Sequence, residues 1–231
     1  MPSGSATRRR KNPVTARRGP SPWVIVAVVV LVLFAGGIGY AVYSAQRSAG
    51  EVAVPAGGSE TGITVGQAAA PATIDLYVDF QCPACKQYEE QVGPTIDRLV
   101  DAGEAKVVYH PVAFLNRFSS TEYSTRSSSA AACAADAGVF PQYAKTLFAN
   151  QPPENSAGLP DEQLVALGQQ VGAGEDFARC VQGDTYEGWT ASVTEAASRA
   201  GVNATPTVQV DGAEIERTTD ALVAAVQAAQ R

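Results

Sequence analysis

The sequence predicts an α/β fold with an inserted helical subdomain, preceded by one transmembrane helix. The first observation is an uncharged apolar run over residues 23 to 43. The second is a pair of strand-like segments, within residues 72 to 114, that flank a segment with helical spacing. The third is a hairpin pattern near the C-terminus, separated from the first pair by a helical block and followed by a last helix. The resulting order is βαβ, a helical block, and ββα.

The N-terminal part combines a basic cluster with the apolar run. Residues 1 to 22 contain six basic and no acidic side chains, and no charge occurs between Arg18 and Arg47. The run "WVIVAVVVLVLFAGGIGYAVY" has the length of about 20 residues that a helix needs to cross a bilayer. We therefore predict a basic cytoplasmic tail (1–22) and a single-pass anchor in the cell membrane (23–44). The positive-inside rule then places the rest of the chain on the extracytoplasmic side.

A cleaved secretory signal is the alternative reading of this segment. Its apolar region is typically only about 7 to 15 residues long and ends in a small-x-small site. Here the run is longer, and "AVYSAQ" at its end matches such a site poorly, so an uncleaved anchor is favoured. Both readings export the following domain to an oxidising compartment, where disulfides persist.

Residues 45 to 63 are predicted as a flexible linker, because they are rich in Gly, Ala, Ser and Pro and show no apolar period. The domain that follows is predicted at residues 64 to 231. Outside the basic tail, the chain carries 11 basic and 23 acidic side chains, a net charge of −12. Such an acidic domain repels phosphates, so we expect no nucleic acid partner.

The first half of this domain predicts a strand-helix-strand unit. Residues 72 to 80, "ATIDLYVDF", and 105 to 114, "AKVVYHPVAF", are enriched in β-branched and aromatic residues, which favours strands. Apolar side chains at helical spacing lie between them: Tyr88, Val92, Ile96, Leu99 and Val100. A unit of this kind predicts parallel strands joined by a right-handed crossover.

The second half predicts helices followed by a hairpin. Residues 119 to 150 and 160 to 201 have helical character, interrupted by prolines and glycines. Residues 205 to 216 alternate around Asp211-Gly212, a typical hairpin turn, and a short helix closes the chain. This order is that of a thioredoxin fold with a helical insertion at about residues 117 to 182.

Two of the four cysteines, Cys82 and Cys85, form a CPAC motif directly after the first predicted strand. A zinc site would need a second close pair of ligands, but Cys133 and Cys180 are far apart and His110 is the only histidine. We therefore predict no metal site. A structural bridge within CPAC would close too small a ring to stabilise the fold much. A CxxC motif in a βαβ unit instead predicts thiol-disulfide exchange.

The predicted chemistry depends on the position of Cys82 at the start of a helix. Free backbone N–H groups and the positive end of the helix dipole favour a thiolate there, which lowers the pKa and makes Cys82 the attacking sulfur. Pro83 suits the first turn, because its missing N–H would have no partner within the helix. Cys85 lies one turn further in, where it can attack a mixed disulfide.

Residues 64 to 230 resemble the DsbA-like branch of the thioredoxin superfamily, which comprises exported bacterial thiol-disulfide oxidoreductases. The matching segments are "APATIDLYVDFQCPACK", "AAACAADAGVFPQYAKTLFANQ", "FARCVQGDTYEGW" and "AGVNATPTVQVDG". The resemblance implies that Cys82 is the nucleophile and Cys85 the resolving cysteine. It also implies a cis-proline opposite the two sulfurs, here Pro206, which with the preceding Thr205 would contact substrate.

The other two cysteines are assigned with the help of this resemblance. Some relatives carry a second, structural disulfide, and the oxidising compartment favours pairing, so we expect a Cys133–Cys180 bridge. Two free buried thiols are the alternative.

The motif departs from the family pattern at two places. Pro83 and Ala84 occupy the dipeptide in which strong oxidases carry a histidine, which implies a less oxidising pair. Leu76 stands six residues before Cys82, where relatives often bury a carboxylate.

These observations predict an exported thiol-disulfide oxidoreductase that acts on cysteine-containing secreted or cell-envelope proteins and uses no cofactor. The resemblance implies re-oxidation by a quinone-linked membrane oxidoreductase. Two alternatives remain: a disulfide reductase or isomerase, and a non-catalytic peptide-binding or chaperone module on the same fold.

Overall fold

The computed structural model describes residues 52 to 231, together with isolated helical positions between Trp23 and Gly39. The chain divides into two units, Met1–Glu51 and Val52–Arg231, and the fold described here is that of the second unit. The predicted tail (1–22) and most of the predicted anchor (23–44) lie outside the described residues. Within the described part of the chain, no helix is both long and apolar enough to span a bilayer.

A mixed five-stranded sheet in the order β1-β3-β2-β4-β5 forms the centre of residues 52 to 231. Its strands are β1 (Ile63–Val65), β2 (Ala72–Val78), β3 (Ala105–Pro111), β4 (Thr207–Val210) and β5 (Ala213–Glu214). Strands β2 and β3 are parallel, and helix α2 (Pro83–Asp101) joins them; the other neighbouring strands are antiparallel. The predicted strand-helix-strand unit and the C-terminal hairpin are thus confirmed.

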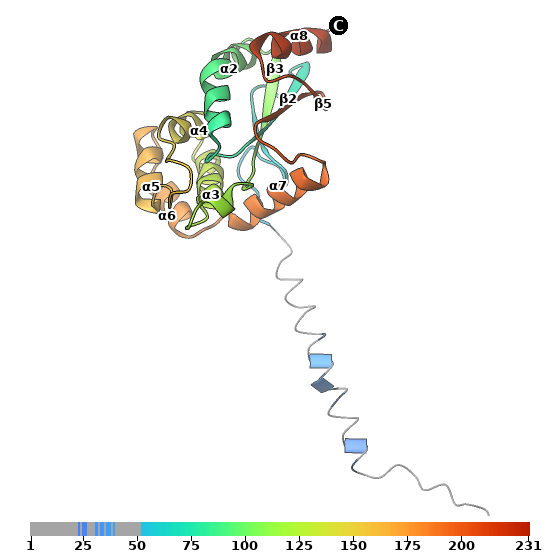
Figure 1. Cartoon of the computed structure of the whole chain (residues 1–231), viewed down its shortest axis with the longest axis vertical. Coiled ribbons are helices and arrows are strands. Elements are labelled where there is room, and N and C mark those ends of the chain that lie inside the picture. Colours follow the sequence, from blue (N-terminus) through green and yellow to red (C-terminus); the bar gives the residue numbers. More distant parts are fainter. Residues whose placement is uncertain are drawn as a thin grey trace, which may run out of the picture. The chain divides into compact units, whose positions relative to one another are not determined.

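The remaining helices follow the predicted order. They are α3 (Tyr123–Asp136), α4 (Phe140–Ala149), α5 (Asp161–Gln170), α6 (Glu175–Gln182), α7 (Glu187–Arg199) and α8 (Thr219–Ala229), with a 3-10 turn, η1 (Asn116–Phe118), before α3. Helices α3 to α6 gather beside the sheet as a helical subdomain, while α2, α7 and α8 pack on the strands (Figure 1).

The apolar period of α2 matches the face that the helix buries. The buried residues of α2 include four of the five side chains with the predicted spacing: Tyr88, Val92, Ile96 and Leu99. They pack into one core with the inward residues of β2, of which Ile74 and Leu76 are almost fully buried. Burial of apolar area at about 25 cal/mol per Å² makes this contact the main force that fixes α2 on the sheet.

The hairpin turn attaches β4 and β5 to the centre of the sheet. Asp211 and Gly212 both have positive φ, 49° and 81°, as a two-residue hairpin loop with right-handed strand twist requires. The carboxylate of Asp211 also accepts a hydrogen bond of 2.9 Å from the N–H of Thr73, in β2. The turn therefore contributes to the register between β4 and β2.

The predicted linker (45–63) ends earlier in the chain than expected. Ile63 is 2% exposed and starts β1, where it pairs with Tyr109 of β3. The indole N–H of Trp189 donates to the carbonyl of Ser59 at 2.8 Å, and the N–H of Ala56 donates to Asp136 at 2.7 Å. Residues 56 to 63 thus belong to the domain, and a three-residue edge strand is too short to show an alternation in the sequence.

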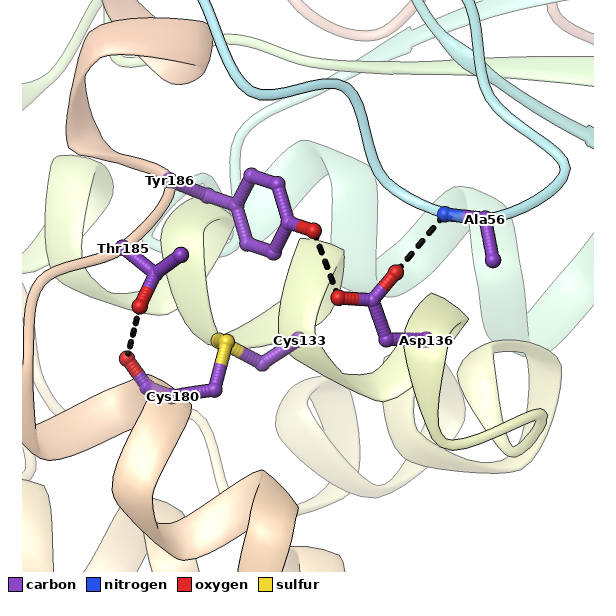
Figure 2. The surroundings of a disulfide bond; sticks show 6 residues. All are labelled: Ala56, Cys133, Asp136, Cys180, Thr185 and Tyr186. Atoms are coloured by element: carbon purple, nitrogen blue, oxygen red, sulfur yellow. Dashed lines mark hydrogen bonds between the residues drawn. A yellow bond between two sulfur atoms is a disulfide. The ribbon is translucent and has the colours of Figure 1, made fainter.

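A disulfide joins the long helix of the subdomain to its last helix. Cys133 of α3 and Cys180 of α6 form a bond of 2.02 Å across 47 positions (Figure 2). Beside it, Asp136 accepts hydrogen bonds from Ala56 and from the hydroxyl of Tyr186 (Figure 2). The N-terminal segment, α3 and α6 are therefore tied together in one region.

Replacing both Cys133 and Cys180 by alanine should destabilise the domain. In the chain-entropy model, a bridge across 47 positions contributes about 4 kcal/mol to the free energy of unfolding. Urea denaturation of the double variant and of the wild type measures the difference, and wild-type protein with reductant serves as the control. An unchanged midpoint in the double variant would contradict a stabilising role for the bridge.

Candidate active site

The CPAC motif lies at the N-terminus of α2, next to the C-terminal end of β2. Cys82 is the N-cap residue, in an extended conformation, and Pro83 is the first helical residue. The N–H of Cys82 donates to the carbonyl of Asp79 at 2.9 Å, so a tight turn leads from the strand into the helix. Cys82 is 7% exposed and Cys85 only 1%, and both are free thiols. The outer sulfur is thus Cys82, and Cys85 lies beneath it.

The surroundings of the two sulfurs shift their pKa values in opposite directions. A hydrogen bond from the Cys85 thiol lowers the pKa of Cys82 to about 6 despite the opposing effect of burial; the Thr205 side chain and the N–H groups of Cys85 and Ala84 contribute in the same direction. Burial, together with the Cys82 sulfur, raises the pKa of Cys85 well above its ordinary value. At neutral pH, Cys82 is therefore largely a thiolate, while Cys85 keeps its proton.

The Thr205-Pro206 segment faces the sulfurs from another part of the chain. The peptide bond between Thr205 and Pro206 is cis, and the Cys82 thiol, when protonated, donates to the Thr205 carbonyl at 3.4 Å. These residues are 123 positions apart in sequence. The site residues proposed from the sequence thus meet at one place: Cys82, Cys85, Thr205 and Pro206.

A groove of about 730 Å³ opens beside Cys82. Its lining includes Pro83, Ala84 and Thr205 from the motif and the cis-proline segment, together with apolar Phe114 and Leu115. Pro83 and Ala84 are exposed. An extended peptide in this groove would therefore have direct access to the reactive sulfur.

A buried carboxylate, Asp79, lies under the turn that leads to Cys82. Asp79 is fully buried and accepts hydrogen bonds from the N–H of Gln81 (2.9 Å), the hydroxyl of Ser124 (2.8 Å) and the N–H of Leu115 (2.9 Å). Burial raises its pKa to about 6. Three donors offset much of the cost of removing this carboxylate from water.

In relatives, such a carboxylate is expected at the position of Leu76, and from the sequence Asp79, at the end of the strand, was not expected to fill this role. Leu76 is 1% exposed and belongs to the apolar core. The signal for Asp79 was its place between two fully apolar neighbours, Val78 and Phe80, directly before the motif. Whether such a residue turns inward depends on hydrogen-bond donors from distant parts of the chain. Here these donors are Ser124 of α3 and Leu115 after β3, and the local sequence around Asp79 contains neither.

His110 does not line the groove, and its ring makes contacts that stabilise the fold. Its Nε2 lies 2.9 Å from Asp75 Oδ1, its Nδ1 lies 2.5 Å from the carbonyl of Thr61, and its ring stacks on Tyr77. In the part of the chain that the structure describes, no three His, Cys, Asp or Glu side chains lie close enough together to hold a metal ion.

Comparisons with known proteins agree with this geometry. A model of the thioredoxin family matches residues 58 to 228. The reduced form of the disulfide bond oxidoreductase DsbG from Mycobacterium tuberculosis is 34% identical, with a TM-score of 0.64, over 72% of this chain and 83% of that chain. Reduced DsbA from the same organism is 32% identical, with a TM-score of 0.64, over 78% of this chain and 93% of that chain. BdbD from Bacillus subtilis, at 19% identity and a TM-score of 0.66 over 77% and 96%, shares the fold.

A curated relative extends well beyond the matched region. The serine/threonine-protein kinase PknE of Mycobacterium tuberculosis is 34% identical over 155 residues, or 63% of this chain. That match spans only 27% of the kinase. The similarity therefore concerns one part of a longer protein.

The alkylation rate of Cys82 should report its low pKa directly. In the reduced chain, the rate with iodoacetamide should rise with pH around a midpoint near 6, because the thiolate is the reacting species. Since this pKa lies below 9, the ordinary value of a cysteine thiol and the one expected in the unfolded chain, the thiolate stabilises the reduced fold fully above pH 9. That contribution declines as the pH falls from 9 and is lost below 6.

The Cys85→Ala variant is the informative comparison, because it removes the largest cause of the shift and should move the midpoint upward. The Cys82→Ser variant should show no fast alkylation in this pH range. A wild-type midpoint near 9 would rule out the thiolate stabilisation described above.

Proposed function

Because the chain belongs to the thioredoxin family, in its branch of DsbA-like thiol-disulfide oxidoreductases, we propose that Cys82 and Cys85 exchange disulfides with secreted or cell-envelope proteins. One observation carries this proposal most directly. The Cys82 sulfur combines a pKa of about 6 with a position at the groove, opposite the cis-proline segment. A thiol with these properties is both a good nucleophile near neutral pH and a good leaving group.

In the oxidising direction, the reaction starts from a Cys82–Cys85 disulfide. A substrate thiolate attacks the sulfur of Cys82, and Cys85 leaves as a thiolate that takes up a proton. A second substrate thiolate then attacks the substrate sulfur of the mixed disulfide, and Cys82 leaves as a thiolate. Two electrons thus pass from two substrate thiols to the cysteine pair, and the low pKa of Cys82 favours its departure.

The groove supports peptides as the substrate class. Phe114 and Leu115 offer apolar contact beside Cys82, and Thr205 lines the same groove. An extended peptide can pair with a free backbone edge while its side chains occupy neighbouring pockets. Such binding would align a substrate cysteine with Cys82.

The same atoms permit the reverse direction, which makes a reductase or isomerase the second candidate. The absence of histidine from the Pro83-Ala84 dipeptide favours a less oxidising pair than in strong oxidases. For the oxidase, we propose a quinone-linked membrane oxidoreductase as the acceptor of the two electrons. A glutathione titration separates the directions, since about −120 mV is typical of an oxidant and about −270 mV of a reductant.

The wild-type chain should oxidise a reduced, unfolded substrate protein, and Cys82→Ser should abolish this turnover. Cys85→Ser should retain the first attack of Cys82 on a substrate disulfide but lack the resolving thiol. It should therefore accumulate a mixed disulfide at Cys82. Non-reducing electrophoresis and mass spectrometry of the cross-linked species measure both outcomes.

The Cys133→Ala/Cys180→Ala variant should retain exchange under conditions in which it is folded, because this bridge lies outside the groove. Insulin reduction should be measured in parallel. A non-catalytic peptide-binding module would show neither reaction, and full activity of Cys82→Ser would contradict the assignment of the nucleophile.

We further propose a single-pass position in the cell membrane, with the N-terminus in the cytoplasm and the catalytic domain outside. The support is the basic cluster of residues 1 to 22 before the apolar run. In a Cys82→Ser/Cys85→Ser background, a membrane-impermeant thiol reagent on intact cells should label Gln170→Cys but not Ser3→Cys. Both should be labelled in lysed cells, and the opposite pattern on intact cells would reverse the orientation.

A further inference from the structure

The side chain of Gln151 reaches from the helical subdomain to the active-site turn. Gln151 follows α4, and its own N–H still donates to Phe148 at 3.2 Å, so its backbone is held at the end of that helix. Its side-chain nitrogen Nε2 lies 2.9 Å from the carbonyl oxygen of Phe80 and 3.0 Å from that of Cys82. The side chain is half-buried in this position.

These two contacts match the chemistry of a carboxamide. A carbonyl oxygen only accepts hydrogen bonds, so the amide nitrogen and not the amide oxygen must face both partners. The nitrogen carries two hydrogens, one for each carbonyl. Gln151 therefore bridges two carbonyls that lie on either side of Gln81, within the turn between β2 and α2.

Aromatic packing supports the same junction. Phe80 is fully buried, and its ring lies 5.0 Å from that of Phe148 at the end of α4. Asp79, one residue before Phe80, is held by a hydrogen bond from Ser124 of α3. The helical subdomain thus contacts the turn through both α3 and α4.

The Cys82 carbonyl also starts the hydrogen-bond pattern of α2. It accepts bonds from the N–H of Cys85 at 3.1 Å and of Lys86 at 3.2 Å. The N–H groups of Ala84 and Cys85 stabilise the Cys82 sulfur, so the position of that sulfur relative to them depends on how the Cys82 backbone is oriented. A bond from Gln151 to this carbonyl restricts that orientation.

We propose that Gln151 is a positioning residue that fixes the Cys82 peptide plane from the helical subdomain and so keeps the Cys82 sulfur aligned with the N-terminus of α2. The proposal rests on the proposed function in that Cys82 is the attacking sulfur. Gln151 touches no reacting atom and acts through the backbone of Cys82. The residues that set the reactivity of the motif thus include one that lies 69 positions away from Cys82.

The test compares Gln151→Met with Gln151→Lys in the full, reduced chain. Methionine keeps the length and removes both donors, whereas lysine keeps donors for the two carbonyls. A neutral hydrogen bond changes an equilibrium by roughly 2- to 10-fold. Gln151→Met should therefore shift the midpoint of Cys82 alkylation upward by about 0.3 to 1 pH unit, and Gln151→Lys should leave it at or below the wild-type value.

A redox titration against glutathione gives a second readout. Because the thiolate stabilises the reduced pair, Gln151→Met should make the pair less oxidising by the same factor. The matched controls are Gln170→Met and Gln170→Lys, on an exposed position of α5, which should change neither quantity. Asp79, the other ionisable group under the turn, keeps its partners Gln81, Ser124 and Leu115 in all four variants.

An unchanged midpoint in folded Gln151→Met would overturn the proposal. An upward shift in both Gln151 variants would also overturn it, because side-chain shape and not hydrogen-bond donation would then be responsible. If Gln151→Met does not fold, the lysine variant decides at high salt, which screens its added positive charge. A midpoint at the wild-type value then supports donation, and a higher one opposes it. Alkylation requires no substrate, so the result stands apart from whether the wild-type chain exchanges disulfides with proteins.

Discussion

The stabilisation of a thiolate at Cys82 is the interaction on which the proposed chemistry depends. The helix start supplies the N–H groups of Ala84 and Cys85, and the Cys85 thiol and the Thr205 side chain add hydrogen bonds. The sheet brings these groups together, because Tyr77 of β2 pairs with Thr207 of β4. That register places the cis-proline segment opposite the end of β2, where the chain turns into α2. A change of register would therefore remove one side of the site.

The helical subdomain is joined to this site by polar contacts and not only by packing. Ser124 of α3 and the N–H of Leu115 hold the buried carboxylate of Asp79 under the active-site turn. Gln151, after α4, donates to the Phe80 and Cys82 carbonyls of the same turn. A buried polar group left without partners costs about 1 to 3 kcal/mol, so these contacts favour one arrangement of the turn. The subdomain thus contributes to the geometry of the motif and, through Glu154 between α4 and α5, to the lining of the groove.

The N-terminal segment and the disulfide form a second junction, on the far end of α3. Asp136 lies one helical turn after Cys133 and accepts bonds from Ala56 and Tyr186 (Figure 2). Ser59 accepts a bond from the indole of Trp189 in α7. Part of the segment predicted as a linker therefore contacts α3 and α7 before β1 begins.

The sequence by itself determined the elements and the reactive motif, because these are set by local periodicity and by backbone preferences of neighbouring residues. The apolar spacing of α2, the Asp211-Gly212 turn and the place of Cys82 at a helix start all belong to this class. The family resemblance supplied Pro206, which no local signal distinguishes from other prolines. Only the tertiary structure decided that Asp79 is held by three donors and that Gln151 contacts the Cys82 carbonyl. Such contacts join residues dozens of positions apart, and their geometry is fixed by packing that no short stretch of sequence contains.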